Sequence, residues 1–220
     1  MSALPARDGY RLWAPLYDRE TPVSLLEDRL VSRIGPSPER RRLLDVGCGT
    51  GRRLRAARAA MAVGIDAAPE MLARGSGEER FAAADVRALP IAPARFDLVW
   101  CRLVVGHVPA LAPAYEELAR VCRPGGTIVV TDFHPAAVAA GHRRTFRDAT
   151  GTVHEIAHHV HTAEDHLLVA TRLGLAPVAR EEGEVGPVVR PLYSAAGRLD
   201  AYQEQLGLRL VLALAFARAG

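Results

Sequence analysis

The sequence predicts a single α/β domain built on a mostly parallel β-sheet. From residue 43 onward, short apolar runs alternate with stretches of helical periodicity, which is the pattern of parallel strands joined by crossover helices. The chain has 220 residues, of which 49% are hydrophobic, and a chain of this length can be built around one hydrophobic core. We therefore expect one globular unit over residues 1–220.

The first five strands and the three helices between them are expected in the core segment, residues 41–133. The strands are predicted over residues 43–47, 62–66, 81–85, 96–101 and 127–133, and the helices over residues 51–60, 69–74 and 113–121. Pro69 and Pro113 stand where the first turn of a helix tolerates proline. Pro124, Gly125 and Gly126 are expected to end the third helix and turn the chain into the fifth strand.

Two segments outside this core are expected to cover it. Residues 1–40 are predicted to form a helical cap, because apolar residues recur near helical spacing within a helix expected over residues 10–34. Residues 134–163 interrupt the alternation and hold most of the histidines. We expect this insertion after the fifth strand to be a lid over the working edge of the sheet.

The remaining segment, residues 164–220, is predicted to contain the rest of one helix and two strands. Thr162 is the expected N-cap of the helix, because acidic residues follow it in the first turn, and Gly174 is its expected end. The apolar run 208–217 suits a helix or a strand equally well by length and composition, and topology alone favours a strand. The Gly, Pro and Glu residues of 181–191 indicate an exposed loop.

Composition argues against several classes of protein. No apolar run approaches the roughly 18 residues of a membrane span, and residues 1–18 mix charged with apolar residues, unlike a secretory signal, so we expect a cytoplasmic protein. The three cysteines are an odd number without CxxC spacing, which argues against a disulfide framework and a zinc site. The net charge of +3 is weak evidence for a nucleic-acid partner.

The strongest chemical signal is a glycine motif at the end of the first predicted strand. Gly47, Gly49 and Gly51 follow Asp45 at alternate positions. At such positions the backbone can turn tightly and approach a ligand that a Cβ would block. In doubly wound sheets the ligand crevice lies at this end of the strands, so the motif predicts a ligand contact there.

Acidic residues end the next two predicted strands on the same side. Asp66 is placed to accept hydrogen bonds from both ribose hydroxyls of a nucleoside, and Asp85 from an adenine amino group. The alternative for both residues is that they cap the helices that follow. Acidic strand ends in succession favour the nucleoside site.

With these motifs the chain resembles the class I S-adenosylmethionine-dependent methyltransferases. The matching stretches are DVGCGTG at 45–51, VGID at 63–66, ADV at 84–86, FDLVWC at 96–101 and ELARVCRPGG at 117–126. The resemblance implies a Rossmann-like three-layer sandwich with a seven-stranded, mostly parallel sheet whose last strand is antiparallel. Outside the core it leans toward small-molecule methyltransferases of ubiquinone biosynthesis and secondary metabolism.

The resemblance also implies S-adenosylmethionine as the cofactor, S-adenosylhomocysteine as its product, and the residues that bind them. The glycines are expected at the methionine part, Asp66 at the ribose, Asp85 and Val86 at the adenine, and the Cys101 backbone at the methionine amino group. Tyr17 resembles an aromatic residue that such families carry in the N-terminal helix over the cofactor's carboxylate, and simple packing of an amphipathic helix is the alternative. The full expected set is Tyr17, Asp45, Gly47, Cys48, Gly49, Gly51, Asp66, Ala67, Met71, Asp85, Val86 and Cys101.

Histidines are the candidate catalytic residues. Methyl transfer needs a nucleophile aligned with the S–CH3 bond and, for a hydroxyl or a protonated amine, a general base, which is most often histidine near neutral pH. His107 follows the fourth strand, His134 follows the fifth, and His158 lies in the lid. A satisfied loop histidine or a helix cap is the alternative for the first two. The histidines of 154–161, taken as a strand, divide between two faces, so no metal is expected.

The expected function is metal-independent methyl transfer to an O, N or C atom of a small metabolite, by a monomer or homodimer with no nucleic-acid or membrane partner. The alternative is a protein that binds S-adenosylmethionine for other chemistry, or as a sensor or structural ligand. A nicotinamide oxidoreductase is disfavoured, because the last glycine of GxGxxG would fall at Arg52. A nucleic-acid methyltransferase would call for an Asn/Asp-Pro-Pro-aromatic motif or an added basic domain, and the sequence has neither.

Overall fold

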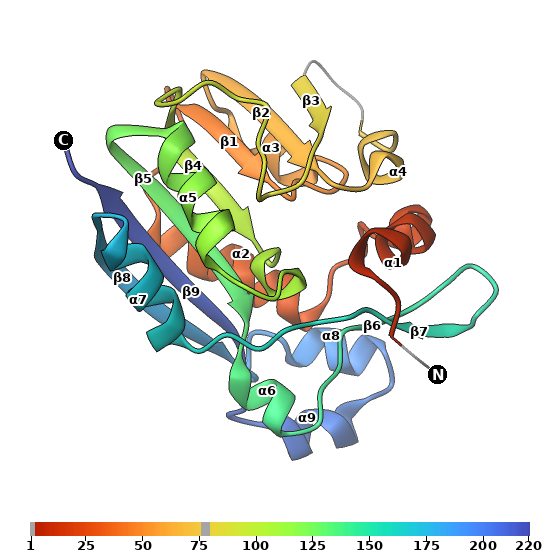
Figure 1. The fold of residues 1–220 in the computed structure, drawn as a ribbon. Coiled ribbons are helices and arrows are strands. Elements are labelled where there is room, and N and C mark those ends of the chain that lie inside the picture. The colour runs from red at the N-terminus through yellow and green to blue at the C-terminus, as the bar shows by residue number, and fades with distance from the viewer. Residues whose placement is uncertain (1–2, 76–79) are drawn as a thin grey trace.

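The structure, a computed structural model, describes residues 3–75 and 80–220 and is centred on a seven-stranded sheet (Figure 1). The strand order is β3-β2-β1-β4-β5-β9-β8. The strands from β3 to β5 pair in parallel, and β9 lies antiparallel to both of its neighbours. The strands are β1 (Arg42–Val46), β2 (Met61–Asp66), β3 (Arg80–Ala83), β4 (Phe96–Arg102), β5 (Cys122–Phe133), β8 (Leu175–Glu184) and β9 (Arg209–Arg218).

Helices cover both faces of this sheet and make a three-layer sandwich. The apolar residues of α5 (Ala112–Val121) and α7 (Ala163–Arg172) belong to one hydrophobic cluster with side chains of the sheet. On the opposite face, α2 (Pro22–Ile34), α3 (Arg52–Ala57), α8 (Arg190–Ala195) and α9 (Leu199–Gln205) contribute to a second cluster. Leu43 and Leu44 of β1 point into different clusters, because successive strand residues face opposite sides. The predicted fold class is confirmed.

Two predictions for the C-terminal segment have different outcomes. The run 208–217 is the strand β9, as topology suggested. The exposed loop expected over 181–191 is wrong in part, because β8 continues to Glu184 and Val185 and Val189 are buried. β8 is one of the two edge strands of the sheet, and charged side chains are common on edge strands because one side faces water. Its glutamates and its one arginine therefore resemble a charged loop in sequence.

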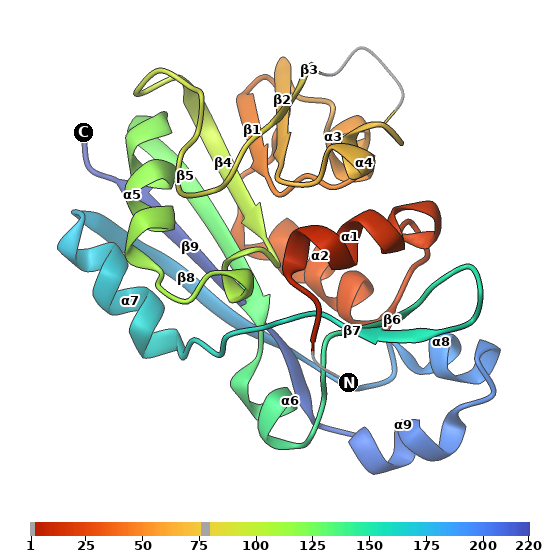
Figure 2. The same cartoon turned by 45° about the vertical axis from the view of Figure 1, so that its right-hand side comes forward.

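The N-terminal cap is two helices rather than the one expected over residues 10–34. α1 (Ala6–Trp13) passes into the short 3-10 helix η1 (Ala14–Leu16), and α2 begins after Thr21. Thr21 and Ser24 form a capping box, and Pro22 takes the first helical position, where its missing N–H costs nothing. α1 and α4 (Pro69–Leu72) lie near each other at the carboxyl end of the sheet in both views (Figures 1 and 2).

The insertion after β5 contains a short helix and a hairpin. These are α6 (Pro135–Ala139) and the antiparallel pair β6 (Thr145–Arg147) and β7 (Val153–Glu155). The strand expected over 154–161 is wrong beyond Glu155, because the chain leaves the hairpin there and crosses to η2 (Val105–His107), where His159 N–H donates to Gly106 O at 2.7 Å. Trp13 stacks on Phe146 at 5.1 Å between ring centroids, which joins the cap to the hairpin.

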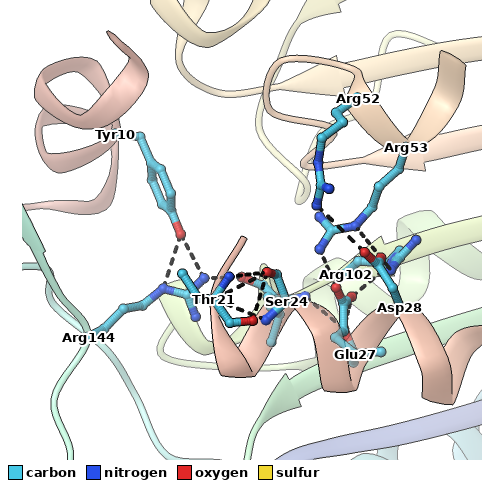
Figure 3. Close-up of polar contacts among 11 residues, drawn as sticks. Tyr10, Thr21, Ser24, Glu27, Asp28, Arg52, Arg53, Arg102 and Arg144 are labelled. Carbon is cyan, nitrogen blue, oxygen red and sulfur yellow. Dashed lines mark hydrogen bonds and ion pairs between the residues drawn. The ribbon is translucent and has the colours of Figure 1, made fainter. Parts of the chain in front are cut away.

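A buried ionic network attaches α2 to the sheet. The side chain of Glu27 is fully buried, and its Oε1 accepts hydrogen bonds from Arg102 Nε and Thr131 Oγ1, both at 2.8 Å. Arg53 pairs with the other oxygen of Glu27 and with Asp28, and Arg102 also pairs with Asp28. Burial acts to raise the pKa of Glu27, but Arg102 and Arg53 outweigh it and lower that pKa. Figure 3 shows these side chains converging on α2.

Replacement of Glu27 by alanine is expected to lower the free energy of unfolding by about 3–5 kcal/mol. The substitution would leave the guanidinium of Arg102, which is also buried, without its main counter-charge. Urea unfolding measures the change, and Glu116→Ala on the exposed side of α5 is the matched control. Equal losses in the two variants would contradict the structural role given to the network.

Candidate functional site

A cavity of about 500 Å³ lies at the carboxyl ends of the parallel strands, within the usual size range of small-molecule sites. The last residues of four strands line it: Val46, Asp66, Ala83 and Arg102. The loops that follow these strands supply most of the remaining wall, and α1 and Tyr17, the residue after η1, contribute from the side of the cap. The cavity thus lies at the strand ends, where open α/β sheets bind ligands.

The glycine loop forms the part of the wall next to β1. Gly47 and Gly49 line the cavity, and both have a left-handed backbone, with φ of +76° and +59°. A Cβ at Gly47 would lie 2.0 Å from Cγ2 of Val104, so a side chain there would displace the loop after β4. Gly51 has φ of +74° but does not line the cavity, because Phe81 packs against it.

Asp66 holds the glycine loop and faces the cavity. Its Oδ2 accepts a hydrogen bond from Gly49 N–H at 2.8 Å, and its Oδ1 accepts one from Ala68 N–H at 2.9 Å. Burial raises its pKa. The Ala68 contact is a local turn of the kind proposed as the alternative role, yet the carboxylate also borders the cavity, where its remaining lone pairs can accept hydrogen bonds from a ligand.

Asp85 lines the same cavity with its carboxylate held by a neighbour. Arg87 donates to Oδ1 from Nε at 2.8 Å and to Oδ2 from Nη2 at 2.7 Å, and these hydrogen bonds lower the pKa of Asp85. The pair is half-exposed. The amino group of a ligand would therefore either share the Asp85 carboxylate with Arg87 or displace Arg87 from it.

Asp45 lies behind the loop, one residue before the lining Val46. Its side chain is 1% exposed, and its Oδ1 has no hydrogen-bond partner among the described residues. Burial raises the pKa of Asp45 to about 7, against the opposing charges of Arg102 and Arg53. An unsatisfied buried carboxylate oxygen beside the cavity fits a ligand that brings a cationic donor, such as the amino group expected of the cofactor.

The structure gathers most, but not all, of the expected cofactor residues on this wall. Those that line the cavity are Tyr17, Gly47, Gly49, Asp66, Ala67, Met71, Asp85 and Val86. Those that do not are Asp45, Cys48, Gly51 and Cys101, and three of these are buried side chains one layer behind it. Cys48 packs near Gly64, and Cys101 is fully buried in β4. Any contact from Cys101 would come from its backbone.

His107 lines the cavity, but its basic nitrogen is occupied. Its Nδ1 lies 3.1 Å from the carbonyl of Ala157, which can only accept, so Nδ1 carries the proton. Nε2 therefore accepts from the Tyr10 hydroxyl, at 3.0 Å. Burial and the nearby charge of Arg144 lower the pKa of His107 to about 3. A histidine in this state is a weak general base near neutral pH.

The other two candidate histidines lie away from the cavity. His134 caps α6 by accepting from Ala136 N–H at 3.0 Å, and its Nε2 lies 3.5 Å from Glu182 of β8. This is the helix-cap position that was the alternative for His134. His158 lies behind η2, with its Nε2 3.6 Å from Oδ1 of the buried Asp132. Neither residue lines the cavity, so this geometry does not support a general-base role for either.

Some residues of the cavity wall carry no expectation from the sequence. Arg102 lines the cavity and joins the Glu27 network, and Tyr10 separates the cavity from Arg144. A charged residue directly after a buried apolar strand is a signal that could have identified Arg102. Tyr10 lies in the predicted cap with no comparable signal. Among the described residues, no group of three or more His, Cys, Asp or Glu side chains is arranged to hold a metal ion.

Comparison with known proteins places this cavity in context. Residues 44–130 match the family model described as a methyltransferase domain. The 27-O-demethylrifamycin SV methyltransferase of Amycolatopsis mediterranei is 32% identical over 203 residues, which cover 84% of this chain and 72% of that protein. The malonyl-[acyl-carrier protein] O-methyltransferase of Enterobacter lignolyticus is 38% identical over 109 residues, or 47% of this chain and 43% of the relative.

The match to the second relative covers less than half the length of that protein. Among solved structures, an S-adenosylmethionine dependent methyltransferase from Mesorhizobium loti aligns with a TM-score of 0.68 at 23% identity, covering 88% of this chain and 98% of that one. At this level of identity the structural match shows a shared fold.

The lowered pKa of His107 predicts a specific loss of stability in mild acid. The unfolded chain takes up a proton on this residue near pH 6.5, whereas the folded protein does so near pH 3. Between these values the unfolded state binds more protons, so His107 should reduce the free energy of unfolding by up to about 1.4 kcal/mol per pH unit as the pH falls.

His107→Gln should therefore show a shallower decline of unfolding free energy than the wild type between these two pH values. Denaturant unfolding at a series of pH values measures it, and His159→Gln is the control, because His159 is exposed. Parallel curves for His107→Gln and the wild type would mean that His107 titrates normally.

Proposed function

This chain belongs to the S-adenosylmethionine-dependent methyltransferases, and we propose that it transfers a methyl group to an O, N or C atom of a small metabolite without a metal ion. The observation that supports the proposal most is the cavity at the strand ends, lined by the glycine loop, Asp66 and Asp85. The two relatives described above are named for methylation at oxygen, which favours oxygen among the three atoms.

In this proposal, different cavity residues bind different parts of S-adenosylmethionine. Gly47 and Gly49 allow the methionine part to approach the backbone, and the charge of Asp45, buried behind them, favours its cationic amino group. Asp66 accepts from the ribose hydroxyls, and Asp85 with Val86 borders the adenine. When bound, the cofactor supplies an electrophilic methyl group on a sulfonium.

The chain's own contribution to the reaction is proposed to be alignment and exclusion of water. Tyr10 and Tyr17 come from the N-terminal cap and line the cavity, and Tyr17 packs on Gly49. The hydrogen bonds of His107 hold the loop after β4 to the lid through the Ala157 carbonyl. An acceptor that arrives already ionised needs no general base, which agrees with the occupied state of His107.

The proposed partner is therefore a small-molecule acceptor. We propose that the protein works in the cytoplasm as a monomer or homodimer, without a nucleic-acid or membrane partner. No helix among the described residues has the length and apolarity required to cross a membrane.

Binding of S-adenosylhomocysteine tests the cofactor assignment. We expect calorimetry to show one molecule bound per chain and no binding of NAD, since the chain has no dinucleotide glycine pattern. Asp66→Ala should weaken S-adenosylhomocysteine binding by about 1–3 kcal/mol, because ribose hydroxyls would lose their acceptor in a desolvated site.

The control for this experiment is Asp200→Ala, whose carboxylate is 74% exposed on α9. It should bind S-adenosylhomocysteine as the wild type does. An unchanged affinity in Asp66→Ala would return Asp66 to a purely local turn-forming role. Failure of the wild-type protein to bind S-adenosylhomocysteine would overturn the proposed function itself.

A further inference from the structure

A second cavity, of about 290 Å³, adjoins the first. Tyr17 and Leu103 line both of them. Its other walls come from α1, the first turn of α2, α3 and the lid segment 142–145. Because the two cavities share these wall residues, a molecule in the second cavity lies next to the proposed cofactor site.

The lining of this second cavity is strongly basic. It contains five arginines and no aspartate or glutamate: Arg19, Arg52, Arg53, Arg143 and Arg144. Arg53 and Arg52 form ion pairs with Asp28 of the ionic network, with N···O distances of 3.0 and 3.6 Å. The other three have no carboxylate within 4.0 Å among the residues that the structure describes.

Arg144 is the most enclosed of these three, since Arg19 and Arg143 are exposed. Its Nε and Nη2 donate to the Tyr10 hydroxyl at 3.1 and 2.8 Å, and Nη2 also donates to the Leu103 carbonyl at 3.1 Å. Its Nη1 makes no hydrogen bond to any described residue. Figure 3 shows Arg144 reaching from the lid to Tyr10, apart from the arginines that converge on Glu27 and Asp28. A partly buried guanidinium without a counter-ion is costly unless an anion reaches it.

Apart from Thr21, Ser24, His142 and Thr145, the rest of the wall is apolar or aromatic. Trp13, Phe133, Tyr193 and Leu210 line it together with Val23. Such a wall favours a ligand with an apolar body, while the free donor of Arg144 favours an oxyanion at one end. The first turn of α2 also borders the cavity and contains no acidic residue, so its dipole adds to the positive potential.

We propose that this second cavity is the acceptor site and that Arg144 binds an oxyanion, a carboxylate or a phosphate, on an acceptor with an apolar body. The proposal rests on the proposed function, because it assigns the substrate class of the same methyl-transfer site. It also accounts for the lack of a free base at His107, since a carboxylate acceptor is already a nucleophile at neutral pH.

The test measures ligand binding to the protein saturated with S-adenosylhomocysteine, so it does not depend on turnover. The probes are hydrocinnamate, its neutral amide, and phenethyl phosphate, which share a phenyl group on a short alkyl chain. One of the two anions should bind at least about tenfold more tightly than the amide, because a charge-assisted hydrogen bond is lost with the charge. Which anion binds more tightly distinguishes a carboxylate from a phosphate acceptor.

Arg144→Gln should weaken binding of the preferred anion by about tenfold or more and leave the affinity for the amide and for S-adenosylhomocysteine within about twofold. Arg144→Lys, which keeps the charge but not the fork of donors, should fall between the wild type and Arg144→Gln. Arg172→Gln is the matched control, an exposed arginine on α7 outside both cavities.

The result that overturns the inference is a wild-type protein that binds S-adenosylhomocysteine but binds neither anion more tightly than the amide, including the case in which none of the probes binds. Equal weakening of anion and amide in Arg144→Gln would also overturn it, since that pattern means a change of shape. Absence of S-adenosylhomocysteine binding would instead count against the proposed function, so the two failures are distinguishable.

Discussion

The buried carboxylate of Glu27 is the constraint on which the arrangement of the site depends. It joins α2 to the end of β4 through Arg102, to α3 through Arg53 and to β5 through Thr131. Arg102 is also part of the first cavity wall, and Arg53 is part of the second. Buried ion pairs gain little net stability but tolerate few geometries. One acid therefore sets the position of the cap relative to both cavities.

The sheet and the cofactor wall could be predicted because their signals are local. An apolar strand, an acid and alternate glycines occur within nine residues of sequence, and the same pattern of strand and acid recurs at Asp66. The seven-stranded sheet with an antiparallel last strand is what the resemblance to the methyltransferase family implied. The predictions were wrong for elements whose sequence fits two kinds of structure. In the edge strand β8, for example, the same charged residues suit either a strand that faces water or an exposed loop.

The polar groups around the two cavities could not be predicted, because each depends on distant contacts. Arg144 meets Tyr10 across 134 positions of sequence, and Arg102 meets Glu27 across 75. Whether an arginine has a counter-ion is a property of the folded chain. The histidines show the opposite difficulty, because their positions in the sequence favoured a catalytic role for His134 and His158. In the folded chain a ring nitrogen of His134 caps α6, and Nε2 of His158 lies near Asp132.

The place of β9 has a consequence for how this chain is made. β9 follows every other strand in the sequence, yet it lies inside the sheet, between β5 and β8. While the ribosome is still producing residues before Arg209, the inner edge of β5 and one edge of β8 have no partner, and both expose backbone groups that can pair with another chain. Such late, non-local closure slows folding and invites aggregation. The sheet of the growing polypeptide is therefore complete only when its final strand has emerged.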